Sequence, residues 1–240
     1  MRDEVTMMRP FVRAACGLLL ACAAPVAAQT PQGVVVELYT SQGCSSCPPA
    51  DAFLATLADD PGVIPLALHV DYWDYIGWSD SFANPKFTDR QKAYAHAAGS
   101  KTIYTPQFII GGQDRVIGHS PGDVAAAIVD VMQRGGTMQL WLERRGDLVS
   151  IRAVADKPLS QQMRVQLVRY QPSSLVSIER GENAGHKIPY HNIVTSWSSL
   201  GDWDGQGEFT VQVPAKGDQP IVVIIQSEGP GSILAAAQIP

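Results

Sequence analysis

The feature that most constrains the fold is an alternation of strand-like and helix-like segments over residues 34–134. Apolar runs of strand length are followed by stretches whose apolar residues recur at helical spacing. A strand, a helix and a further strand imply parallel pairing, whereas the glycine-rich turn at residues 111–114 implies a hairpin and an antiparallel edge. We therefore predict an α/β domain with the order β-α-β-α-β-β-α, in which helices cover a mixed four-stranded sheet.

The expected elements are bounded by glycine, proline and helix-capping residues. The strands are expected at 34–39, 63–70, 107–110 and 115–117, and the helices at 50–58, 85–98 and 121–132. Pro48 and Pro49 precede the first helix. Because proline lacks the N–H that helical hydrogen bonds require, we expect this helix to begin after them or to bend there.

Beyond residue 137 the helical stripes end, and short strand-like runs separated by turn residues follow. Regular short strands at this spacing are typical of a β-sandwich. We therefore expect two domains, residues 29–136 with the α/β pattern and residues 137–240 as an all-β, sandwich-like extension. The strand candidates in the extension are residues 140–142, 149–154, 165–170, 176–178, 193–197, 209–213, 221–225 and 233–236.

Residues 1–28 have the pattern of a secretory signal peptide, in which Arg9 and Arg13 form a basic start, an apolar run covers 14–24 and small residues follow. The apolar run is too short to span a bilayer, and no other stretch is apolar enough to cross one. We therefore expect a periplasmic or secreted protein, with a lipoprotein variant through Cys22 as an alternative.

The composition restricts the possible function classes. The chain is 45% hydrophobic and 17% charged, with a formal net charge of −5 at pH 7. This excludes an intrinsically disordered chain, and without a Lys/Arg run nothing supports nucleic-acid binding. Removal of the leader leaves only Cys44 and Cys47, in an oxidising compartment. Two cysteines exclude a scaffold of several disulfides, so their spacing must have another meaning.

Cys44 and Cys47 form a Cys-Ser-Ser-Cys motif between the first strand and the first helix. A sulfur at a helix N-terminus is near unpaired backbone N–H groups and the positive end of the helix dipole, which favour its thiolate. Two intervening residues place the second sulfur close enough to close a disulfide. We therefore predict a redox dithiol in which Cys44 is the nucleophile and Cys47 is the resolving thiol.

Two other interpretations of the cysteines stay open. In one, they form half of a Cu(I) or Zn site completed by a histidine, because soft sulfur suits these ions. In the other, a structural disulfide only fixes a loop of a non-enzymatic binding module. No histidine lies at a standard ligand spacing from the cysteines, so we assign no metal ligand and no cofactor; the candidates are His69, His119, His186 and His191.

Thr105-Pro106 lies immediately before the third strand. Proline can adopt the cis form at modest cost, and in this topology the third strand begins beside the N-terminus of the first helix. A cis proline there would keep the backbone close to the sulfurs and leave its neighbour's backbone free to pair with an extended substrate. We therefore include Thr105 and Pro106 in the predicted catalytic site.

Residues 34–134 resemble a thioredoxin-fold domain, with the two cysteines and Thr105-Pro106 at the positions of that family's active-site pair and cis proline. The chain also resembles a family of exported bacterial proteins, domain of unknown function 1223, through the segments VELYTSQGCSSCPPAD, HVDYWDYIGWSD, YTPQFIIGG and GENAGHKIPYHNIV. This resemblance covers nearly the whole mature chain and implies a thioredoxin-like fold. Unlike ordinary thioredoxins, the chain has no Trp before Cys44, and Ser-Ser replaces their Gly-Pro.

Two further groups complete the predicted site. In thioredoxins a buried acid on the first strand helps to transfer the proton of the resolving thiol, and the resemblance gives this role to Glu37, with a simple hydrogen-bonded core acid as the alternative. Ligands in such sheets bind at the carboxyl ends of strands, so the aromatic loop after the second strand is expected to bind substrate. The alternative is a loop that buries its aromatic side chains against the β-rich half. The residues concerned are Asp71, Tyr72, Trp73 and Trp78.

These features together predict an exported thiol–disulfide oxidoreductase. It would act on a protein or a small thiol or disulfide substrate and exchange electrons with a redox partner. The neutral Ser-Ser pair does not fix the reduction potential, so oxidant, reductant and isomerase remain alternatives.

Overall fold

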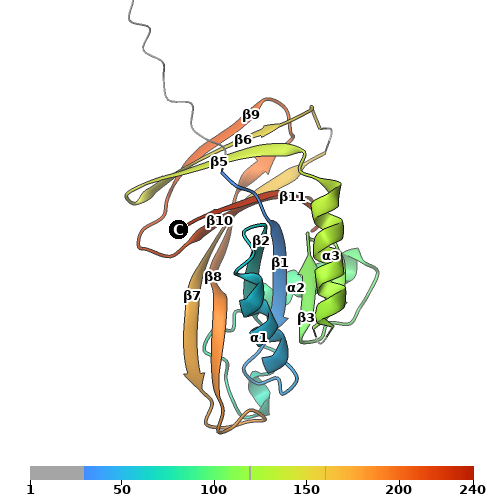
Figure 1. Ribbon diagram of the computed structural model, residues 1–240, viewed down its shortest axis with the longest axis vertical. Helices are drawn as coiled ribbons and strands as arrows, with labels where there is room; N and C mark the ends of the chain where they lie inside the picture. The colour runs from blue at the N-terminus through green and yellow to red at the C-terminus, as the bar shows by residue number, and fades with distance from the viewer. Residues whose placement is uncertain (1–29, 119, 160) are drawn as a thin grey trace, which may run out of the picture.

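The computed structural model describes residues 30–118, 120–159 and 161–240. Within these ranges the chain forms two β-sheets and three α-helices (Figure 1). The expected leader and His119 lie outside the described residues. None of the helices in the described part of the chain is long and apolar enough to cross a membrane.

The first half of the chain alternates strands and helices, and the second half contains strands. The first half comprises β1 (Val34–Thr40), α1 (Pro48–Leu57), β2 (Val63–His69), a short 3₁₀ helix (Asp74–Ile76), α2 (Pro85–Ala97), β3 (Gln107–Ile110), β4 (Asp114–Ile117) and α3 (Pro121–Arg134). The second half comprises β5 (Met138–Arg145), β6 (Leu148–Ala155), β7 (Met163–Ser177), β8 (Lys187–Trp203), β9 (Glu208–Pro214), β10 (Ile221–Ser227) and β11 (Ile233–Ile239).

The large sheet has eight strands in the order β11-β10-β7-β8-β2-β1-β3-β4. The four predicted strands are neighbours in it, with β1 parallel to β2 and antiparallel to β3. The predicted four-stranded sheet is nevertheless too small, because β2 also pairs with β8 through Ala67 and Ile193. Every residue of β2 is buried, as expected for a strand with neighbours on both edges and cover on both faces.

The second sheet has three antiparallel strands in the order β5-β6-β9. Its inner side chains, such as Leu140 and Ile151, share a core with Val165 and Val223 of the large sheet. The second half thus contributes a separate antiparallel layer as well as four strands of the large sheet.

The alternation of side chains along β1 determines what each face of the large sheet contacts. Val36 and Leu38 belong to the core cluster that contains residues of α1 and α3. Val35 and Tyr39 belong to a different cluster, which contains Phe87 of α2. Residues of α1 and residues of α2 therefore pack on opposite faces of the large sheet.

Candidate functional site

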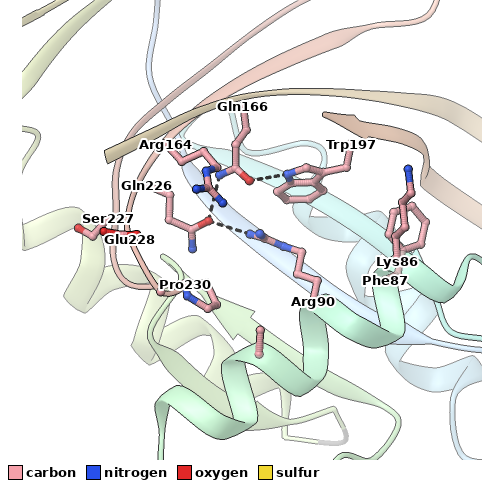
Figure 2. A pocket seen from close by; sticks show the side chains of 12 residues that line it. Lys86, Phe87, Arg90, Arg164, Gln166, Trp197, Gln226, Ser227, Glu228 and Pro230 are labelled. Atoms are coloured by element: carbon pink, nitrogen blue, oxygen red, sulfur yellow. Dashed lines mark hydrogen bonds between the residues drawn. The ribbon is translucent and has the colours of Figure 1, made fainter. Parts of the chain in front are cut away.

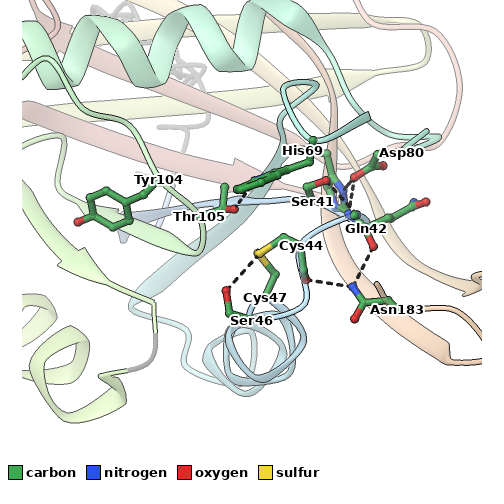
Figure 3. The surroundings of a disulfide bond; sticks show 12 residues. Ser41, Gln42, Cys44, Ser46, Cys47, His69, Asp80, Tyr104, Thr105 and Asn183 are labelled. Carbon is green, nitrogen blue, oxygen red and sulfur yellow. Dashed lines mark hydrogen bonds and ion pairs between the residues drawn. A yellow bond between two sulfur atoms is a disulfide. The ribbon is translucent and has the colours of Figure 1, made fainter. Parts of the chain in front are cut away.

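The disulfide between Cys44 and Cys47 lies between the end of β1 and the start of α1 (Figure 3). Cys44 is 4% exposed and Cys47 is completely buried, whereas Ser45 and Ser46 between them are exposed. The Sγ atom of Cys44 lies 3.5 Å from the Ser46 hydroxyl. Both cysteines are therefore buried, and of the two only Cys44 keeps a small exposed fraction.

Pro48 and Pro49 occupy the first two positions of α1, so the expectation of a later or bent helix start is wrong. The first N–H groups of a helix have no intrahelical acceptor, and proline removes no helical hydrogen bond there. Cys47 is the N-cap, and its carbonyl accepts hydrogen bonds from the N–H groups of Ala50 and Asp51 at 2.9 and 3.1 Å. Neither proline has an N–H that could donate to a Cys44 thiolate. The expected stabilisation of that thiolate must therefore come mainly from the helix dipole.

The loop that carries Cys44 is held from two sides. Asp80 Oδ2 accepts a hydrogen bond from the backbone N–H of Gln42 at 2.8 Å. Asn183, in the connection between β7 and β8, donates from Nδ2 to the carbonyl oxygens of Gln42 and Cys44 at 2.9 and 3.0 Å (Figure 3). The C-terminal half therefore helps to shape the cysteine loop.

Asn183→Ala is expected to lower the free energy of unfolding by about 1–3 kcal/mol, because the Gln42 carbonyl loses its donor and the Cys44 carbonyl keeps only the N–H of Cys47. Urea unfolding measures this change, with Glu182→Ala, at an exposed neighbouring position, as the control that stays within about 0.5 kcal/mol of the wild type. Dithiothreitol should also reduce the disulfide faster in Asn183→Ala, since the loop over a buried sulfur is released. Equal stability of the two variants would show that Asn183 does not hold the loop.

The Thr105-Pro106 peptide bond is cis, and Pro106 is buried. Trp73 Nε1 donates a hydrogen bond to Thr105 Oγ1 at 2.7 Å. Trp73 also packs against Gly43, where an added Cβ would lie only 3.3 Å from Trp73 Cβ. Trp73 therefore connects the loop before Cys44 to the segment before β3, and Thr105 lies among the residues around the disulfide (Figure 3).

Two other predicted substrate-binding residues interact with α2. The Thr88 hydroxyl donates to Asp71 Oδ1 at 2.6 Å, and the Tyr72 hydroxyl donates to Gln91 Oε1 at 3.2 Å. Burial raises the pKa of Tyr72 to about 12. Asp71 and Tyr72 thus anchor the aromatic loop to the helix.

Of the remaining aromatic residues of this loop, Trp78 packs against a core cluster and Tyr75 is exposed. Trp78 Nε1 donates to Gln42 Oε1 at 2.8 Å, and the Trp78 ring packs beside the core formed by β8 residues such as Tyr190. Tyr75 is 80% exposed and stacks on Trp73 with a ring-centroid distance of 6.5 Å. Tyr75 is therefore the exposed aromatic side chain of this loop, and it is stacked on Trp73.

Glu37 is buried on the face of the sheet that carries α2. Arg90 donates to its two carboxylate oxygens at 2.7 and 2.9 Å, and the hydroxyls of Tyr39 and Tyr94 donate to it at 2.9 and 2.7 Å. Burial alone would lower the pKa of Arg90, but the Glu37 carboxylate raises it above its ordinary value. These surroundings match the alternative interpretation of Glu37, a hydrogen-bonded core acid, and give no support to proton transfer with Cys47.

A different buried acid, Asp51, lies one helical turn after Cys47. Neither of its carboxyl oxygens has a hydrogen-bond partner among the described residues, and burial raises its pKa to about 7 while nearby His69 acts to lower it. His69 Nδ1 lies 2.7 Å from Asp80 Oδ2, and His69 Nε2 and the Tyr190 hydroxyl are also buried without a partner in the described structure. Asp51, His69, Asp80 and Tyr190 thus form a buried polar cluster behind the disulfide.

Asp51, Asp80 and Asn183 were not expected at the site. Asp51 could have been noticed in the sequence as an acid beside the apolar stripe of α1, next to Ala50, which is buried. Asn183 lies in the GENAGHKIPYHNIV segment of the family resemblance, but no spacing in the sequence connects it to Cys44.

The histidines considered as metal ligands do not converge on the cysteines. Among the described residues, no group of three or more His, Cys, Asp or Glu side chains is arranged to hold a metal ion. His69 is paired with Asp80, His186 is exposed and His191 is half-buried in β8.

The fold and the site define an α/β protein with two sheets and a Cys-x-x-Cys disulfide between its first strand and first helix. The chain belongs to the family described as protein of unknown function (DUF1223), whose profile matches residues 35–226. A search of curated proteins found no match. The structure is similar to the crystal structure of a protein from Agrobacterium tumefaciens, with 32% identity, 90% of this chain and 96% of that chain covered, and a TM-score of 0.75. HBP35 of Porphyromonas gingivalis is similar in fold, with 16% identity, 89% and 76% coverage and a TM-score of 0.63.

Proposed function

We propose that this protein is an exported thiol–disulfide oxidoreductase whose first half has a thioredoxin-like fold. The observation that carries the proposal is the placement of the disulfide between β1 and α1, with Cys44 next to the exposed Ser45 and Ser46 and Cys47 completely buried at the N-cap of α1. The order of β1–β4 and α1–α3 supports the fold assignment. The signal-peptide pattern of residues 1–28 supports export to the periplasm or the medium.

The proposed reaction moves two electrons through the dithiol. In the reducing direction, the Cys44 thiolate attacks one sulfur of a substrate disulfide, forms a mixed disulfide and releases the other substrate sulfur as a thiolate. Cys47 then loses its proton and attacks the Cys44 sulfur, which releases the second substrate thiol and closes the Cys44–Cys47 disulfide. The reverse sequence oxidises a substrate dithiol.

Asp51 is the group best placed to exchange a proton with Cys47. It lies one turn along α1, is buried on the same side of the sheet, and has a pKa of about 7 as a result of burial. A carboxyl group with that pKa can take up and return a proton near neutral pH. We therefore assign to Asp51 the role that the sequence suggested for Glu37.

Asp51→Asn is expected to remove a pH dependence of stability. The pKa of Asp51 is about 7 in the folded protein, against about 3.9 for an unfolded aspartate. Between these pH values the folded state keeps a proton that the unfolded state has lost, so stability falls as pH rises, by about 1.4 kcal/mol per pH unit. Urea unfolding at several pH values should therefore show Asp51→Asn gaining stability relative to the wild type as pH rises from about 4 to about 7.

The control for this prediction is Asp59→Asn, which replaces an exposed acid just beyond the same helix. Its stability should follow the wild-type pH profile. Parallel profiles for Asp51→Asn and the wild type would contradict a raised pKa at Asp51.

The proposed function is tested by turnover. The reduced protein should catalyse the reduction of insulin disulfides by dithiothreitol above the uncatalysed rate, or the refolding of a reduced disulfide protein in an oxidising buffer. A protein that accelerates neither reaction has a disulfide that only fixes the loop.

A further inference from the structure

A cavity of about 540 Å³ lies on the face of the large sheet that carries α2 (Figure 2). Its walls come from α2, from β7 and β8, and from the turn between β10 and β11. None of its lining residues belongs to the cysteine loop or to the segment at Thr105. Its volume is within the range of small-molecule binding sites.

The floor of the cavity is fixed by a chain of hydrogen bonds. Trp197 Nε1 donates to Gln166 Oε1 at 2.8 Å, and Gln166 Nε2 donates to Gln226 Oε1 at 3.1 Å. Arg90 Nη2 donates to the same oxygen of Gln226 at 3.1 Å, and the Arg90 guanidinium lies 3.9 Å from the centre of the Trp197 ring. These side chains are held in place without a ligand, which lowers the entropy cost of binding one.

Two of the three cations that line the cavity already have acidic partners. Arg90 binds Glu37 behind the floor at 2.7 Å, and Arg164 binds Asp202 at 3.0 Å. Their charges are therefore largely compensated, and the cavity is not simply an anion site.

Lys86 and Glu228 are the charged lining residues that make no ion pair with another described residue. Both are exposed, and they lie at opposite sides of the cavity (Figure 2). The cavity thus has one positive and one negative end, which complement a ligand with both charges rather than one.

The space between these ends fits a short peptide. A sphere of 540 Å³ is about 10 Å across, the length of about three extended residues at roughly 3.3–3.6 Å each. Ser227 lines the cavity with a hydroxyl that suits a peptide backbone, whereas the amides of Gln166 and Gln226 are already hydrogen-bonded within the floor. Phe87 and Pro230 provide apolar surface for a side chain.

We propose that this cavity binds a peptide of two or three residues with free termini, its carboxylate at Lys86 and its ammonium group at Glu228. The site lies apart from the disulfide and does not depend on the proposed redox function.

The test uses the tripeptide Ala-Leu-Ala, its N-acetylated form and its C-terminal amide, each titrated into the full mature protein by calorimetry. The free tripeptide should bind, and each blocked form should bind about tenfold more weakly because one charge contact is lost. Absence of binding at about 10 mM of the free tripeptide, which corresponds to less than roughly 3 kcal/mol of binding free energy, would overturn the proposal. Equal binding of the acetylated form would also overturn it, since it would indicate a site for simple carboxylates.

Two variants assign the ends of the peptide. Lys86→Gln should weaken binding of the free tripeptide about tenfold and leave binding of the amide unchanged. Glu228→Gln should also weaken binding of the free tripeptide about tenfold, but it should leave binding of the acetylated form unchanged. Lys92→Gln, an exposed position on α2 outside the cavity, should not change any of the affinities. Loss of affinity for all three peptides in both variants would contradict the assigned orientation.

Discussion

Cys44→Ser is expected to abolish catalysed insulin reduction, lowering the rate by at least about 100-fold to that of dithiothreitol alone. Cys44 keeps a small exposed fraction of 4%, whereas Cys47 is completely buried, so we expect Cys44 to be the attacking sulfur. A serine hydroxyl cannot form the mixed disulfide, so the first step is lost. The matched control is Ser45→Ala, an exposed position between the cysteines, which should keep its turnover.

Cys47→Ser should behave differently from Cys44→Ser. It retains the attacking sulfur but lacks the group that resolves the intermediate, so it should accumulate a mixed disulfide with substrate that mass spectrometry detects on Cys44. Accumulation in Cys44→Ser instead would reverse the two roles. Normal turnover in both variants would contradict a redox function of the pair.

Arg90→Met is expected to destabilise the protein by about 3–5 kcal/mol, because Glu37 would remain buried without its cation. Glu37 is completely buried, and Arg90 supplies two of its four hydrogen bonds, the others coming from tyrosine hydroxyls. Replacing both members, in Glu37→Gln with Arg90→Met, should restore part of the loss, since no charge is then buried alone. Urea unfolding of the wild type, the single variants and the double variant gives the coupling energy of the pair.

The control for Arg90 is an exposed ion pair of the second sheet. Arg145 and Glu143 are 76% and 52% exposed at a distance of 2.8 Å, and Arg145→Ala should cost less than about 1 kcal/mol. If Arg90→Met cost no more than Arg145→Ala, Glu37 would not depend on Arg90 for its charge.

The elements of the first half could be predicted because their signals are local. Apolar spacing located β1–β4 and the three helices, and Asn84 caps α2 by accepting a hydrogen bond from the N–H of Lys86 as its sequence position suggested. The size of the sheet could not be predicted, because the contact of Ala67 with Ile193 joins distant parts of the chain. Nothing in the periodicity of either strand identifies its partner.

At the site, too, features with a local sequence signal were predictable and contacts between distant parts of the chain were not. Cys44 and Cys47 were predictable from spacing and position, whereas Asn183 reaches the cysteine loop only through the hairpin of β7 and β8. Glu37 was correctly expected to be buried, but burial alone did not show which face of the sheet it occupies. The positions of α1 and α2 on opposite faces separate Glu37 from the disulfide and leave Asp51 beside it.

The reduction potential of the Cys44–Cys47 pair tests the proposed function most directly. Equilibration of the purified protein with glutathione buffers, followed by thiol alkylation and mass spectrometry, gives the oxidised fraction at each potential. A redox catalyst should have a midpoint within about −270 to −120 mV, the range of known dithiol oxidoreductases. A midpoint below about −300 mV is typical of structural disulfides and would contradict an exchange function for this pair.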